Sequence, residues 1–160
     1  MTDAISTNAT LAAAPATEAE ALAWATRLFV ELPVAGLLGA RPLRCDPHAG
    51  RMTVAFEARR EFCNLMGSVQ GGMLTAMLDL AMSFAVLCSM EDGHVVPSLE
   101  IKTTFVAPAR PGEIVGEGIM IRRGRSIAFM EGRLTDADGN LLSTASATGQ
   151  IRLRDGRKSG

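Results

Sequence analysis

The sequence has little net charge and lacks any long apolar run. Its 16 Lys and Arg against 17 Asp and Glu give a formal net charge of −1, so no basic excess indicates a nucleic-acid or anionic-membrane surface. A membrane-spanning helix needs about 20 apolar residues, and the longest candidate, Met73 to Met90, is interrupted by Asp79. We therefore expect neither a nucleic-acid partner nor a membrane span.

Basic residues are also missing from positions 1–16, which are rich in Ala and Thr and include Asp3. A secretory signal needs a basic start and a strong apolar block, so this segment is expected to be a disordered tail. The three cysteines, Cys45, Cys63 and Cys88, are odd in number and lack metal-ligand spacing. They predict free, buried thiols in a reducing cytoplasm and no metal site.

Periodicity and turn residues predict one α+β domain over 17–154, followed by a loose tail over 155–160. A helix is expected over 17–31, because Thr17 and Glu20 resemble a capping box and Pro33 ends the segment. The predicted β-structure is a hairpin followed by an antiparallel meander, with strands over 43–45, 52–56, 95–106, 114–121, 127–134 and 141–153.

The segment 71–90 predicts a helix, since it contains no proline and its only glycine pair stands at its start. It is apolar nearly all round, which indicates burial on most sides. The predicted architecture is therefore a curved antiparallel sheet wrapped around one long central helix, with an extra N-terminal helix.

Polar and small residues nevertheless form one stripe on this helix, because Gly71, Thr75, Asp79 and Ser83 are spaced four apart. A buried carboxylate without a partner is costly. One interpretation is that Asp79 bonds an amide or a basic side chain inside a dimer interface. The alternative is catalytic: Gly71 and Gly72 leave the first amides of the helix open to a ligand oxygen, as an oxyanion site requires.

The spacing within the helix favours a dimer. Asp79 lies roughly 12 Å by helical rise from Gly71, too far to act on a carbonyl held at its own helix start. An antiparallel partner helix would bring the two groups together. We therefore expect composite sites shared by two subunits, with Gly72 and Thr75 contacting substrate.

Three sequence segments then indicate a family. The stretch NLMGSVQGGMLTAMLDLAMSFA (64–85) resembles the signature of PaaI-like hotdog thioesterases: Asn, Gly, a Gly pair, and an acid eight residues after its first Gly. SLEIKTTFVAPARPGE (98–113) resembles the family's next strand and its Pro-Gly link. With GRSIAF and DADGNLLSTASAT, the resemblance covers about residues 40–153 and implies a cytoplasmic acyl-CoA thioesterase of hotdog fold.

The resemblance also implies roles for matching residues. Gly71 would polarise the thioester carbonyl through its amide, and Asp79 of the other subunit would act as general base or nucleophile. Asn64 would position the attacking water or the carboxylate, and Ser98 would lie near that water, unless it merely caps its strand. The family usually has His before the Gly pair, whereas this chain has Gln70, which can donate a hydrogen bond but cannot become cationic.

Arg123 and Arg125 flank a hairpin turn, and the resemblance allows them to bind the phosphates of coenzyme A; a solvated basic turn is the alternative. No cofactor is expected beyond the coenzyme A of the substrate. The partners implied are an acyl-CoA with a short-chain or aryl (phenylacetyl-type) group and a second copy of the chain, with dimers pairing further into tetramers. Two rival functions stay open: a hotdog hydratase, which would pair a His with the acid, and a non-catalytic acyl-CoA-binding or regulatory module.

Overall fold

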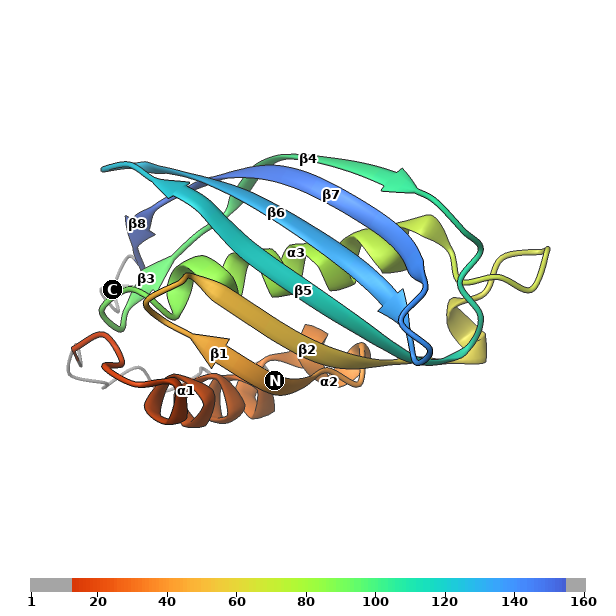
Figure 1. The fold of residues 1–160 in the computed structure, drawn as a ribbon, viewed down its shortest axis with the longest axis horizontal. Helices are drawn as coiled ribbons and strands as arrows, with labels where there is room; N and C mark the ends of the chain where they lie inside the picture. Colours follow the sequence, from red (N-terminus) through yellow and green to blue (C-terminus); the bar gives the residue numbers. More distant parts are fainter. Residues whose placement is uncertain (1–12, 155–160) are drawn as a thin grey trace, which may run out of the picture.

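The computed structural model describes residues 13–154, in which an antiparallel sheet curves around the long helix α3 (Gly71–Leu87). Figure 1 shows α3 running behind the sheet, with the helix α1 (Glu18–Glu31) below its lower edge. The predicted α+β architecture is confirmed. Residues 13–16 have no regular secondary structure. The rest of the two predicted tails, 1–12 and 155–160, lies outside the described residues.

The sheet has six strands in the order β1-β2-β5-β6-β7-β4. Their bounds are β1 Arg41–Asp46, β2 Arg51–Ala58, β4 Ser98–Phe105, β5 Gly112–Arg123, β6 Ile127–Asp136 and β7 Leu141–Gln150. The hairpin of β1 and β2 and the run β5-β6-β7 follow the prediction. The prediction of a four-strand meander is wrong for β4, because this strand pairs with β7 and not with β5. The Pro-rich link after β4 therefore crosses from one edge of the sheet to its middle, and β4 is left as an edge strand.

Two predicted strands are each broken in two. The expected strand over 95–106 divides into β3 (His94–Val95) and β4, because Pro97 has no amide proton for the ladder. The expected strand over 141–153 divides at Ile151, whose amide donates to the carbonyl of Ser126, and continues as β8 (Arg152–Leu153). β3 and β8 pair with each other in a separate ribbon.

Helix α3 fills the concave side of the sheet, which explains its apolar composition. Its buried residues are Leu74, Met77, Leu78, Leu80, Ala81, Met82, Phe84, Ala85 and Val86. The helix passes so close to β5 that a Cβ on Gly118 would lie 2.2 Å from the carbonyl oxygen of Ala81. It ends at Leu87, three residues before the predicted end, with Cys88 as its C-cap.

Helix α1 packs beside β1 and against the end of α3. Thr17 accepts from the amide of Glu20 as predicted, but the Glu20 carboxylate accepts from Ala16 and the capping box is only half formed. Pro33 opens a further short helix, α2 (Pro33–Leu37). Phe29 of α1 meets Phe84 of α3 edge to face, with ring centroids 4.6 Å apart, which gives the extra helix a place in the core.

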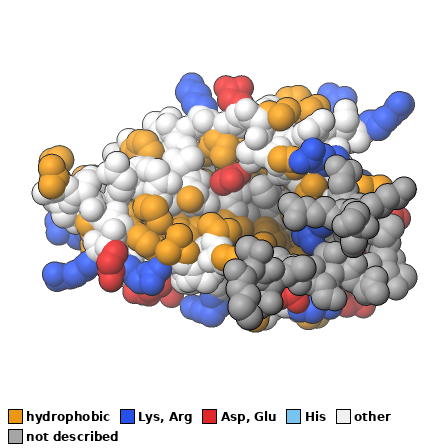
Figure 2. Space-filling view, turned by 180° about the vertical axis from the view of Figure 1, so that it is seen from behind, with side chains coloured by type: hydrophobic (Ala, Val, Ile, Leu, Met, Phe, Trp, Pro, Cys, Tyr) orange, Lys and Arg blue, Asp and Glu red, His pale blue; other side chains and the backbone are white. Residues whose placement is uncertain are grey.

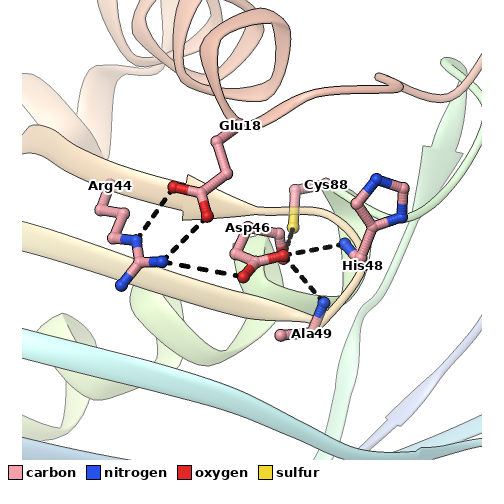
Figure 3. Close-up of polar contacts among 6 residues, drawn as sticks. All are labelled: Glu18, Arg44, Asp46, His48, Ala49 and Cys88. Atoms are coloured by element: carbon pink, nitrogen blue, oxygen red, sulfur yellow. Dashed lines mark hydrogen bonds and ion pairs between the residues drawn. The ribbon is translucent and has the colours of Figure 1, made fainter.

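Polar contacts also join α1 to the first hairpin (Figure 3). Glu18 receives two hydrogen bonds from Arg44, at 2.9 and 3.1 Å. Next to this pair, Asp46 accepts from the amides of His48 and Ala49, and its carbonyl oxygen faces the thiol of Cys88.

All three cysteines are free, as predicted, with two of them buried and Cys63 half-buried. Hydrogen bonding to Cys45 and burial raise the pKa of the Cys88 thiol, which keeps it protonated. A second short helical turn, η1 (Arg60–Phe62), precedes α3. None of the helices described is long and apolar enough to cross a membrane.

Candidate active site

The polar stripe of α3 faces the edge strand β4. All four of its residues are half-buried on a helix that is otherwise mostly buried. Three contacts join the stripe to the strand: Gly71 lies under the ring of Phe105, the Thr75 hydroxyl lies 3.1 Å from that of Thr103, and Asp79 accepts from Ser98. The four residues therefore lie along one side of the helix, as their spacing predicted, and this side follows one edge of the sheet.

Asp79 has one hydrogen-bond partner in the described part of the chain. The Ser98 hydroxyl donates to its Oδ1 atom at 2.5 Å, and no Lys, Arg or His among residues 13–154 forms an ion pair with it. The carboxylate is half-buried in the single chain, less than the burial that the sequence predicted. A carboxylate held by one hydroxyl and no cation has lone pairs left for water or substrate.

The start of α3 presents free amides. The amides of Met73 and Leu74 both donate to the carbonyl of Gln70, whereas those of Gly71 and Gly72 have no acceptor within residues 13–154. A Cβ on Gly72 would meet no atom within 4 Å, so this side of the helix start is open. The side chain of Gln70 is exposed and makes no capping bond to any residue that the structure describes. Such a helix start is suited to bind a carbonyl oxygen that gains negative charge.

These two features lie on the same helix, eight residues apart, which is roughly 12 Å along its axis. One chain therefore does not bring the Asp79 carboxylate to its own free amides. Helix α3 is also incompletely covered beside the stripe, since Ala76 and Leu87 are half-buried. Figure 2, seen from behind the sheet, shows hydrophobic side chains in the middle of this side and Lys and Arg mostly at its rim.

The side chain of Asn64 is occupied within its own loop. Its Oδ1 atom accepts from the amides of Met66 and Ser68, at 2.9 and 3.3 Å, and its Nδ2 atom lies 3.0 Å from the Ser68 hydroxyl. Thr75 is similarly engaged, because its hydroxyl lies 3.0 Å from the carbonyl of Gly71 and 3.1 Å from Thr103. Both predicted site residues lie near the helix start, and both already have hydrogen-bond partners in their own loop, helix or edge strand.

The predicted basic residues lie at the opposite end of α3. Arg123 donates to the carbonyl of Ser89, just beyond the helix, at 3.0 Å. Arg125, beyond the same turn, is exposed. Both line a hollow of about 420 Å³, together with Ala14, Ser89, Met90, Glu91, His94, Gly124 and Ile151.

Sequence reasoning missed two residues of β4 that contact the stripe, Thr103 and Phe105. Their alternate spacing in the strand places both on the face toward α3, but nothing local indicated which strand would lie there. No group of His, Cys, Asp and Glu side chains that could hold a metal ion occurs in residues 13–154.

Comparison with known proteins shows which family the chain belongs to. The family model of the thioesterase superfamily matches residues 66–143, which include the whole of α3 and β4. Human acyl-coenzyme A thioesterase 13 is 29% identical over 101 residues, covering 62% of this chain and 71% of the human protein.

Solved structures agree. A phenylacetic acid degradation-related protein from Ralstonia eutropha JMP134 is 37% identical with a TM-score of 0.73, covering 78% of this chain and 96% of that protein. The E. coli PaaI protein shares the fold, with a TM-score of 0.73 at 16% identity over 81% of this chain and 93% of its own. The Ralstonia protein is itself described as a thioesterase, and the 37% identity extends over nearly all of it. The chain therefore belongs to the thioesterase superfamily, as its resemblance to the PaaI-like hotdog thioesterases predicted.

Proposed function

We propose that this protein hydrolyses acyl-CoA thioesters at sites shared by two subunits, with Asp79 of one chain acting on a carbonyl held by Gly71 of the other. The observation that carries the proposal concerns one helix. Within residues 13–154 it has a carboxylate without a cation and a start with two amides that lack acceptors. Because the carboxylate and the free amides are too far apart to act together within one chain, each needs its counterpart from a second copy of the chain.

The edge strand β4 supports a dimer. It pairs with β7 on one side, and its other side has no partner strand within residues 13–154. Leu99 and Phe105 on this strand are more than half exposed. Unpaired, apolar edges favour association. Antiparallel pairing of two copies of β4 would set the two α3 helices antiparallel, with the stripe of each facing the other subunit. Further pairing into tetramers stays a prediction.

In the proposed reaction the thioester oxygen accepts a hydrogen bond from the Gly71 amide, and the Gln70 side chain adds a second donor. Asp79 takes a proton from water as the water oxygen attacks the carbonyl carbon, or attacks it directly to give an anhydride that water then cleaves. The carbon–sulfur bond breaks, and the proton passes to the thiolate of coenzyme A. Ser98 orients the carboxylate, while Gly72 and Thr75 line the approach to the helix start.

The hollow beside Arg123 and Arg125 is the proposed place for the phosphates of coenzyme A. Ser89, which Arg123 contacts, lies ten residues beyond Asp79, roughly 15 Å by helical rise, a separation that the pantetheine arm can bridge. Arg123 already covers a carbonyl at the helix end, which leaves Arg125 for the anion. For the acyl group we propose a short-chain or aryl acid, which agrees with the name of the Ralstonia relative.

The test is turnover by Asp79→Asn and Asp79→Ala on a panel of short-chain, aryl and long-chain acyl-CoAs, measured as free-thiol release. Loss of turnover is expected with folding and dimerisation unchanged, whereas the control Asp138→Asn, at an exposed turn, stays active. Normal turnover by the Asp79 variants would remove the mechanism. Absence of turnover by the unaltered protein, with acyl-CoA still bound, would favour a binding module.

Shared sites have a separate test. Gly71→Pro removes the amide donor at the first helix position, where backbone geometry tolerates proline and the half-exposed ring of Phe105 must swing aside. Gly71→Pro and Asp79→Asn are each expected to be inactive. Mixed subunits form heterodimers in which one of the two sites is intact, and about a quarter of the normal activity should return. Failure of the mixture to recover activity, with heterodimers demonstrated, would exclude a composite site.

A further inference from the structure

The loop before α3 is built to hold its tip in one place. The side-chain oxygen of Asn64 accepts from two backbone amides of the loop. The backbone amide of Asn64 donates to the backbone carbonyl of Ser68 at 2.8 Å. Gly67 supplies the turn with a φ of 76°. The base is closed by a β-bridge between Cys63 and Val69. Every one of these bonds serves the shape of the loop itself.

What this loop displays is apolar. Leu65 is fully exposed and Met66 is 91% exposed, and Figure 1 shows the loop projecting beyond the start of α3. From Phe62 to Ala85 the single charged residue is Asp79. Two large apolar side chains held rigidly in water are unfavourable, and the loop offers no polar group at its tip to compensate.

The base of the loop is joined to the proposed active site. The Gln70 amide donates to the carbonyl of Phe62, and the Val69 amide donates to that of Ala109 in the link after β4. The loop therefore leads directly into the free amides of Gly71 and Gly72. On the other side of this helix start lies the ring of Phe105, itself 52% exposed.

From this arrangement we infer that the loop Asn64–Ser68 is a specificity element: Leu65 and Met66 contact the acyl group of the thioester, and Asn64 positions them. This rests on the proposed thioesterase function. A thioester whose oxygen is bound by the Gly71 amide has its acyl carbons within a few ångströms of the helix start, to which the loop with its two exposed apolar side chains is directly joined. In this role Asn64 positions the loop tip. The role implied by the family resemblance was different: there Asn64 would position the attacking water or the carboxylate.

The experiment compares kcat/KM for acetyl-, hexanoyl-, decanoyl- and phenylacetyl-CoA in the unaltered protein and in the double variant Leu65→Ser with Met66→Ser. Contact with the acyl group predicts a loss of about tenfold for the larger groups the protein accepts, relative to acetyl-CoA. Val30→Ser is the matched control, because Val30 is an apolar residue of α1 that is 85% exposed, and its neighbour Phe29 packs on Phe84, near the other end of α3.

An equal change for all four thioesters, or none, would overturn the inference. So would dissociation of the dimer in sedimentation, because the tip would then be a subunit contact. If the unaltered protein turns over no thioester, the proposed function itself has failed, and this is seen before any variant is compared.

Positioning by Asn64 is tested at its partner. Ser68→Ala removes the hydroxyl that lies against the Asn64 side chain and leaves Asn64 in place. Both Ser68→Ala and Asn64→Ala should reduce the preference among acyl groups in the same direction as the tip variant. If Asn64→Ala lowers kcat equally for all substrates while Ser68→Ala changes nothing, Asn64 acts on the reaction directly and the positioning role is refuted.

Discussion

The hydroxyl of Ser98 donates a 2.5 Å hydrogen bond to Oδ1 of Asp79, and so joins the first residue of the edge strand to the middle of the central helix. The two residues are 19 positions apart in the chain. This bond orients a half-buried carboxylate that forms no ion pair in the part of the chain that the structure describes. A hydrogen bond to a charged group is stronger than one between neutral groups, so it holds the proposed catalytic group in a defined direction.

Replacing Ser98 by Ala should lower kcat while leaving the fold intact. Removing a hydrogen bond to a charged group is worth about ten- to a hundredfold in rate if the bond serves the reaction. Ser146→Ala, at an exposed position of β7, is the control and should keep full activity. An unchanged kcat in Ser98→Ala would reduce Ser98 to a strand cap, which is the other interpretation of its position.

Gln70 stands where the PaaI-like family usually has a histidine, and substitutions there test its role. Its side chain is exposed and makes no capping bond, so substitutions there should leave stability nearly unchanged. Gln70→Ala should lower kcat about a hundredfold if the amide donates to the oxyanion. Gln70→His should retain turnover and acquire a pH dependence near pH 6.5 in the rate profile. A Gln70→Ala variant as active as the original would exclude Gln70 from the site.

Gly118 is predicted to be essential for packing α3 on β5. A Cβ there would overlap the backbone of Ala81 at 2.2 Å, and backbone cannot move aside as a side chain can. Gly118→Ala should lower the free energy of unfolding by about 3 kcal/mol in chemical denaturation. Gly36→Ala, in α2 with open space around it, should raise it by about 0.5 kcal/mol. Equal effects at the two positions would contradict the close approach.

The turn at Asp46 predicts an acid-sensitive part of the stability. Hydrogen bonds from the amides of Ala49 and His48, and the charge of Arg44, hold the pKa of Asp46 below its usual value (Figure 3). A lowered folded-state pKa stabilises the protein above about pH 4, the value for unfolded Asp, and this contribution is lost as pH falls through the folded-state pKa.

Asp46→Ala should therefore lower the melting temperature at pH 7, and the difference from the unaltered protein should shrink below about pH 4. Thermal unfolding at several pH values measures both. Ser146→Ala, which removes no titratable group from an exposed position of β7, is the control and should leave the melting temperature nearly unchanged at every pH. A difference that persists undiminished in acid would mean that the carboxylate charge is not responsible.

Most secondary structure could be predicted because its signals are local. The long helix, the first hairpin and the strands β5, β6 and β7 follow from periodicity and turn residues. Errors arose where a single residue interrupts a strand, as Pro97 does, or where a proline starts a helix after ending another, as Pro33 does. A proline is compatible both with the end of one helix and with the first position of the next, so the residues after Pro33 decide whether a second helix forms.

By itself the sequence determined the central helix, its polar stripe and its glycine start, because a repeat of four residues along one helix depends on no distant contact. Only the tertiary structure decided what the stripe would face. Strand order arises from packing between segments far apart in the chain, and it placed β4 at the sheet edge, with Ser98 against Asp79 and Phe105 over Gly71. It also committed the Asn64 side chain to its own loop, since hydrogen-bond partners are set by backbone geometry that residue type leaves open.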